Sequence, residues 1–149
     1  MNIRKAILKE SVSVSLKARD KNGIIEELLD LIVQTGRIPN RKAALKCILE
    51  REKKMSTGMH CGLAIPHGKT DTLDTLVASV GLIPEGVDFD SQDGQPSRIF
   101  VLTVSPENRA GPHIQFLAEI SRLLNREETR QRILQADSVE TLHELFTSE

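Results

Sequence analysis

Two nearly continuous apolar runs, residues 76–83 and 99–104, constrain the fold more than any other feature of the chain. A strand with one buried face alternates apolar and polar residues, whereas a strand buried on both faces reads as an unbroken apolar run. A turn-rich segment that contains Asp93 and Gly94 separates the two runs. We therefore expect two strands near the middle of a sheet that is covered on both faces.

The first third of the chain predicts short elements followed by a long helix. Residues 3–8 are expected to form a short helix, and residues 12–16 alternate as a half-exposed strand does. From Asp20 or Asn22 onward, apolar residues recur at three- and four-residue spacing, and Gly36 is placed to end this helix. This pattern predicts a helix that faces the core.

Further helices are predicted on both sides of the apolar runs. One follows Asn40, and another has Pro112 in its first turn. Residues 127–136 and 137–146 form two more, the second opened by a capping residue, Asp137. Helices that flank apolar strands in this way predict an α/β domain of three layers.

Length and composition limit the class of protein. At 149 residues the chain suits a single domain, residues 1–149, with one core. The chain has 20 Lys and Arg against 21 Asp and Glu, a net charge of −1. Such a balance does not favour binding to nucleic acid or to a membrane surface. There are 4 Phe and no Trp or Tyr, which removes the stacking platforms that hold bases or sugar rings. Because no apolar run could span a membrane or act as a signal peptide, we expect a cytoplasmic protein without membrane insertion.

The sequence predicts no cofactor and no metal. It has no Gly-x-x-x-x-Gly-Lys loop, so a phosphate group is expected to arrive on another protein rather than on a nucleotide. A metal site built from His60, Cys61, His67 and His113 is a competing hypothesis, but these residues lack zinc spacing and a neighbouring carboxylate. Cys47 and Cys61 are expected to be reduced core residues. No nucleophile-elbow pattern indicates a hydrolase.

The candidate site is centred on His67. Residues 63–65 are typical of the end of a buried strand, and Pro66 cannot continue a central ladder. Gly68 allows another backbone or an anion to come close to the imidazole of His67. We therefore expect His67 at a strand end beside a flexible, uncrowded loop. A neutral imidazole can attack phosphorus near pH 7, and its phosphoramidate product is reactive enough to pass the group on.

Arg51 is predicted to lie on the buried face of its helix, after Ala44, Cys47 and Ile48. An unpaired buried charge is costly, so Arg51 needs an anion. A bound phosphate or phosphorylated side chain would serve as well as a carboxylate. The alternative is that Arg51 extends into solvent at the helix end beside Glu52.

His113 directly follows Pro112 and heads a stripe that continues through Leu117, Ile120 and Leu124. The N–H groups and dipole at a helix N-terminus favour an anion. His113 is therefore expected to line a phosphate site without carrying the phosphate. The alternative is a histidine that only caps its own loop.

These residues together carry a family resemblance. The run 62–68, with Arg51 and Glu52 before it and His113 at the matching later position, resembles the active-site signature of a known enzyme family. That family is the enzyme IIA domain of the fructose/mannitol class of the bacterial phosphoenolpyruvate:sugar phosphotransferase system, including its nitrogen-related branch. The likeness covers nearly the whole chain. It implies a three-layer α/β sandwich with a mixed β-sheet of about five strands covered by helices on both faces.

The resemblance also implies an activity. His67 would be the nucleophile that is phosphorylated by the histidine-containing phosphocarrier protein, with Arg51 and His113 beside the phosphate. The group would pass to a cysteine of an enzyme IIB domain, or it would switch binding to a regulatory target protein and so serve nitrogen regulation rather than sugar transport. The alternative is a non-catalytic regulatory interaction module of the same fold.

Overall fold

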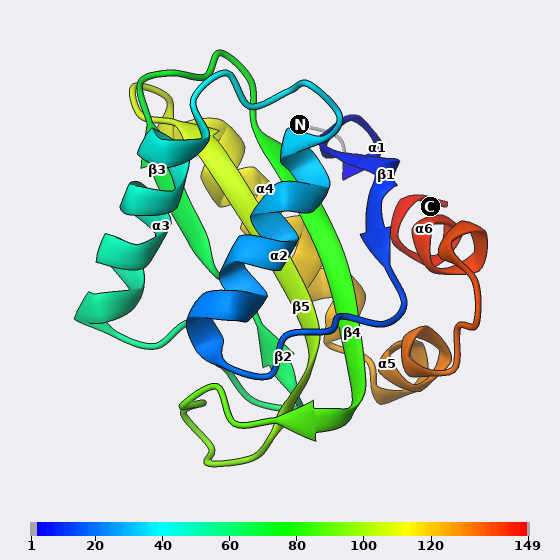
Figure 1. Ribbon diagram of the computed structural model, residues 1–149. Coiled ribbons are helices and arrows are strands. Elements are labelled where there is room, and N and C mark those ends of the chain that lie inside the picture. The colour runs from blue at the N-terminus through cyan, green and yellow to red at the C-terminus, as the bar shows by residue number, and fades with distance from the viewer. Residues whose placement is uncertain (1–2, 149) are drawn as a thin grey trace.

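The computed structural model describes residues 3–148 of the chain, as a sheet with helices packed against it (Figure 1). The helices are α1 (Ile3–Ala6), α2 (Lys21–Val33), α3 (Arg41–Lys54), α4 (Ala110–Leu124), α5 (Glu127–Leu134) and α6 (Val139–Thr147). The strands are β1 (Ile7–Ser13), β2 (Leu63–Ala64), β3 (His67–Thr70), β4 (Val77–Val87) and β5 (Ser97–Pro106). Within this part of the chain, no helix has the length and apolar character needed to cross a membrane.

The two apolar runs form the centre of the sheet. The strand order is β1-β4-β5-β2, and β3 also pairs with β5. β4 and β5 are antiparallel, whereas β1 is parallel to β4, and β2 and β3 are parallel to β5. The sheet is therefore mixed, with residues 76–83 and 99–104 in or next to its central strands, as predicted.

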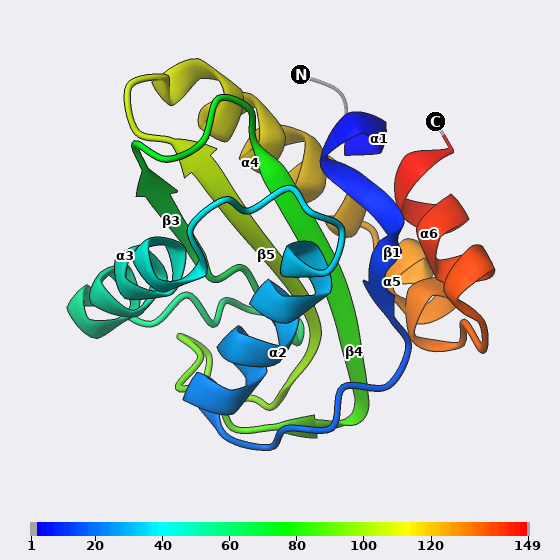
Figure 2. The same cartoon turned by 45° about the horizontal axis from the view of Figure 1, so that its top comes forward.

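Side chains of the central strands alternate between two apolar cores. On β4, Ala78, Val80 and Leu82 pack with residues of α1, α4, α5 and α6. Val77 and Ile83 pack with residues of α2 and α3. This is the period of two that a strand imposes on its side chains. Figure 2 shows α2 in front of the sheet and α4 behind it, so the predicted three-layer sandwich is confirmed.

The strand that carries His67 does not end at Pro66. Leu63 pairs with Ile99. His67 pairs with Thr103 at the same offset along β5, so β2 and β3 are two parts of one interrupted edge strand. Pro66 has no N–H to donate, which an edge strand tolerates, and its carbonyl accepts the Thr103 N–H at 3.1 Å. The predicted strand end beside a flexible loop is wrong, because His67 begins a strand.

The first strand is longer than its sequence pattern indicates. α1 ends at Ala6, so the predicted helix at residues 3–8 is too long, and β1 extends well before the predicted strand at residues 12–16. The pairing of β1 with β4 shifts register between Ile7 and Val12. Such an irregularity breaks the alternation of side chains along β1. The predicted strand overlaps β1 only at residues 12 and 13, and the prediction is wrong for residues 14–16, which lie beyond the end of β1.

The C-terminal helices confirm the prediction with small changes. The N-cap of α6 is Ser138 rather than Asp137, because the Ser138 hydroxyl accepts the Thr141 N–H at 3.1 Å. On α4, Phe116 is fully buried where Leu117 was expected, and Leu117 is only partly buried. Both changes shift a predicted position by one residue and leave the elements in place.

Candidate active site

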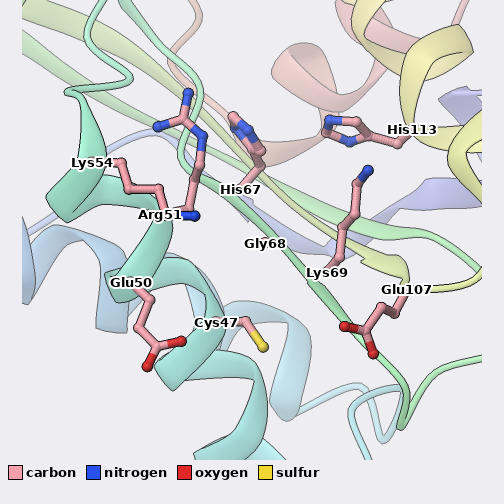
Figure 3. A pocket seen from close by; sticks show the side chains of 9 residues that line it. All are labelled: Cys47, Glu50, Arg51, Lys54, His67, Gly68, Lys69, Glu107 and His113. Carbon is pink, nitrogen blue, oxygen red and sulfur yellow. The ribbon is translucent and has the colours of Figure 1, made fainter.

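A pocket of about 630 Å³ lies where α3, β3 and the start of α4 meet, and Figure 3 shows its side chains. It brings together His67, Arg51 and His113, the residues selected from the sequence. The remaining lining residues are Cys47, Glu50, Lys54, Gly68, Lys69 and Glu107.

His67 is half-buried, and its ring is held in one orientation. Its register partner on β5 is Thr103, and partners in a parallel ladder project to the same face of the sheet, here the face covered by α4. Nδ1 lies 2.9 Å from the carbonyl oxygen of Ile65. A carbonyl can only accept, so Nδ1 carries the proton and Nε2 keeps its lone pair. Burial lowers the pKa of His67, as do the charges of Arg51 and Lys69, so the ring is neutral near pH 7.

His113 faces His67 from the first turn of α4. The two ring centroids are 5.0 Å apart, and the ring planes are inclined by 41°. His113 is 8% exposed. Burial lowers its pKa to about 4, with further contributions from His67, Lys69 and Arg51. The unliganded pocket therefore holds two neutral imidazoles near pH 7.

Arg51 lies half-buried in the last turn of α3. Its Nη1 donates a hydrogen bond to the Met55 carbonyl at 2.9 Å. The prediction that Arg51 occupies the buried face is wrong, because Glu52 is the buried residue in that turn. Arg51 instead lies at the edge of the core, where it lines the pocket and lowers the pKa of His67 and of His113.

Glu52 joins the end of α3 to the loop that follows. Its carboxylate accepts the Thr57 N–H at 2.9 Å and the Thr57 hydroxyl at 2.6 Å, and it pairs with Lys21 of α2 at 2.9 Å. Burial alone would raise the pKa of Glu52, but these partners hold it below its ordinary value. Glu52 thus fixes the loop whose Met55 carbonyl binds Arg51.

Gly68 sets the distance between β3 and α3. A Cβ added at this position would lie 2.9 Å from the backbone nitrogen of Ile48 and 3.1 Å from the carbonyl carbon of Cys47. Neither backbone atom can move without moving α3. The backbone of α3 thus approaches Gly68 itself closely, which a residue with a side chain would not allow.

Replacing Gly68 by Ala is expected to displace α3, and Arg51 with it. Overpacking of this kind costs about 1–3 kcal/mol, so the midpoint of urea unfolding should fall. Gly111→Ala is the matched control, because a Cβ there meets no described heavy atom within 4 Å. Equal midpoints for the two variants would show that α3 adjusts without cost.

The competing metal hypothesis gains no support from the geometry. His60 and Cys61 are both exposed, so the prediction that Cys61 is a core residue is wrong. Cys61 has a φ of 61°, and its N–H donates to Asp93 at 3.3 Å, on a loop outside the pocket. Among residues 3–148, no group of three or more His, Cys, Asp or Glu side chains is placed to hold a metal ion.

A comparison with protein families decides the affiliation of the chain. Residues 5–149 match the family described as "Phosphoenolpyruvate-dependent sugar phosphotransferase system, EIIA 2". The chain belongs to this enzyme IIA family. The resemblance drawn from the run around His67 is thereby confirmed.

Relatives and solved structures of enzyme IIA proteins agree with this affiliation. The fructose-specific EIIA component of Haloferax volcanii is 37% identical over 137 residues, covering 92% of this chain and 89% of the relative. Nitrogen regulatory protein IIA-Ntr from Neisseria meningitidis has a TM-score of 0.88 at 24% identity, covering 96% of this chain and 97% of that one. Enzyme IIA mannitol in its complex with phosphorylated enzyme IIB mannitol from Escherichia coli has a TM-score of 0.79 at 24% identity, covering 94% and 96%. The fold of this enzyme IIA protein is therefore shared with solved members.

Two cations of this enzyme IIA pocket were missed from the sequence, although both left a signal. Lys69 is two residues after His67 on one strand, so the two share a face. Lys54 is three residues after Arg51, which places both on one side of a helix. Glu107 left no such signal, because it follows the end of β5 and reaches the pocket only through the fold.

Proposed function

We propose that this enzyme IIA protein accepts a phosphoryl group from the histidine-containing phosphocarrier protein onto His67, in the cytoplasm. The observation that carries the proposal is the pairing of two neutral imidazoles, 5.0 Å apart, in one pocket with Arg51. A neutral imidazole is the nucleophilic form, and a cation beside it neutralises an incoming phosphoryl group.

The hydrogen bond of His67 supports Nε2 as the attacking atom, because Nδ1 is occupied by the Ile65 carbonyl. Its lone pair forms the new N–P bond, while the N–P bond to the donor histidine breaks and its electron pair returns to the donor ring. Attack places positive charge on the imidazole of His67. The Ile65 carbonyl, which already accepts the Nδ1 proton at 2.9 Å, stabilises that charge without having to move.

Arg51, Lys69 and His113 would stabilise the phosphoryl oxygens. Phosphoryl transfer depends mainly on positioning and charge neutralisation. The guanidinium of Arg51 and the ammonium of Lys69 line the same pocket as His67 and can supply that neutralisation. His113 can add a hydrogen bond from its ring. No nucleotide or metal ion is required by this arrangement, because the phosphoryl group arrives already activated as a phosphoramidate on the donor protein.

The group then passes to a cysteine of an enzyme IIB domain, or its presence switches binding to a regulatory target. The relatives support both acceptors, since one is named for fructose transport and one structural neighbour for nitrogen regulation. A neighbour solved in complex with phosphorylated enzyme IIB supports the first. Incubating the phosphorylated protein with a separate IIB domain distinguishes these two fates. Loss of phosphate from the protein indicates transfer to the IIB cysteine, whereas retained phosphate favours the regulatory role.

Incubation with phosphoenolpyruvate, enzyme I and the phosphocarrier protein tests the first step. Acid-labile phosphate should appear on the protein and map to His67 by mass spectrometry. A chain that binds the phosphocarrier protein but takes up no phosphate would be a non-catalytic interaction module instead.

His113 is expected to speed transfer without carrying the phosphate. A charge-assisted hydrogen bond from its ring to a phosphoryl oxygen would make His113→Ala slower by about ten- to a hundredfold. His113→Gln keeps an N–H donor and should be less impaired. Thermal stability of both variants is measured in parallel, because normal transfer with lost stability would leave His113 only a structural role.

A further inference from the structure

Ser105 lies behind His113 and is the side chain found bonded to that ring. It is fully buried near the end of β5, and its Oγ is 3.3 Å from Nδ1 of His113. Its register partner is Lys69, two residues after His67, so Ser105 projects to the same face of the sheet as His67. The hydroxyl therefore meets the second imidazole from within the sheet.

We propose that Ser105 is a positioning residue, whose hydroxyl donates to Nδ1 of His113 and so keeps the proton of that imidazole on Nε2. The inference deepens the proposed function, on which its catalytic meaning rests. Nε2 is at the outer end of the ring, and Figure 3 shows the ring extending from α4 toward His67. A proton on Nε2 makes His113 a hydrogen-bond donor toward the phosphoryl site.

The direction of the hydrogen bond follows from what each partner can do. Among the described residues, His113 is the one partner found for the Ser105 hydroxyl. If Nδ1 carried the proton and Ser105 accepted it, the buried hydroxyl hydrogen would have no acceptor, which is costly. In that tautomer the lone pair of Nε2 would face the phosphoryl oxygens, which it would repel instead of donating a hydrogen bond to them. Donation by Ser105 satisfies both groups.

The two histidines are then set as opposite tautomers. The Ile65 carbonyl accepts from Nδ1 of His67 and leaves Nε2 free to attack. The Ser105 hydroxyl donates to Nδ1 of His113 and leaves Nε2–H free to donate. One backbone acceptor and one side-chain donor thus prepare a nucleophile and a hydrogen-bond donor in the same pocket.

The test compares Ser105→Ala with Ser79→Ala. Ser79 lies on the adjacent strand, is equally buried, and donates its own hydrogen bond to the Leu28 carbonyl at 2.8 Å. Both variants lose one buried hydrogen bond, so both should lose stability, but only Ser105→Ala loses the contact with His113. Nuclear magnetic resonance of nitrogen-15-labelled histidine, on unphosphorylated protein at neutral pH, reports the tautomer of each ring.

We expect His113 to be protonated on Nε2 in the parent and in Ser79→Ala, and mixed between tautomers in Ser105→Ala. Transfer should slow by about two- to tenfold in Ser105→Ala, the value of one neutral hydrogen bond, and no further when His113 is already Ala. An unchanged tautomer population in Ser105→Ala, or equal slowing in the His113→Ala background, would overturn the inference. If the parent takes up no phosphate, the proposed function fails, while the tautomer measurement still decides the role of Ser105.

Discussion

His67→Ala is expected to take up no phosphate from the phosphocarrier protein. The variant loses the imidazole whose Nε2 lone pair is free. In the tautomer proposed for His113, Nδ1 accepts from Ser105 and Nε2 carries the proton, so that ring has no free lone pair with which to replace His67. The ring of His67 is half-buried, and within residues 3–148 its one hydrogen bond is to Ile65, two residues away, so its removal should leave the fold intact. Labelling with radioactive phosphoenolpyruvate measures uptake directly.

His60→Ala is the matched control for this experiment. His60 lies seven residues before His67 in the same stretch of chain but is exposed and does not line the pocket. The His60→Ala variant should be labelled at the parental rate. Labelling of His67→Ala at the parental level would defeat the proposed function, whatever the behaviour of the control.

The layers of the fold could be predicted from the sequence because they depend on local patterns. Residues 76–83 and 99–104 are apolar on both faces, and that alone requires cover on both sides of the sheet. Helix boundaries followed from capping: Asp20 and Asn40 each accept a backbone N–H three residues later, from Gly23 and Ala43. Such signals are complete within a few residues of sequence.

The environment of His67 could be predicted only in part, because it depends on pairing across the chain. Pro66 correctly marked an interruption, but the strand resumes at His67 since β5 offers the same register on both sides of the proline. Pairing with β5 is not encoded near residue 66. For the same reason the sequence could not place Ser105 against His113.

The position of Arg51 was misjudged because helical periodicity does not identify the tertiary partners of a turn. Arg51 and Glu52 are adjacent, so either could face the core by spacing alone. Glu52 is buried because Lys21 of α2 and Thr57 supply the bonds that its carboxylate needs. Arg51 is left at the edge of the core and lines the pocket, which suits the role proposed for it beside an arriving phosphate.

Arg51→Ala should slow phosphoryl transfer by about a hundredfold or more, the usual effect of removing one electrostatic contact to a transition state. Arg51→Lys keeps the charge but is expected to remain well below the parental rate. The guanidinium bonds the Met55 carbonyl through Nη1 and still has N–H groups to offer two phosphoryl oxygens. A lysine ammonium cannot hold the carbonyl and present a planar pair of donors at the same time.

Arg41→Lys provides the control for the lysine variant. Arg41 begins the same helix, pairs with Asp30 at 2.6 Å and Glu26 at 3.2 Å, and does not line the pocket. These pairs are exposed, so the change should alter neither stability nor transfer appreciably. Single-turnover rates at saturating phosphocarrier protein separate chemistry from docking. If Arg51→Lys transferred phosphate as fast as Arg41→Lys, the charge of Arg51 alone would be sufficient and its paired donors would have no role in the transition state.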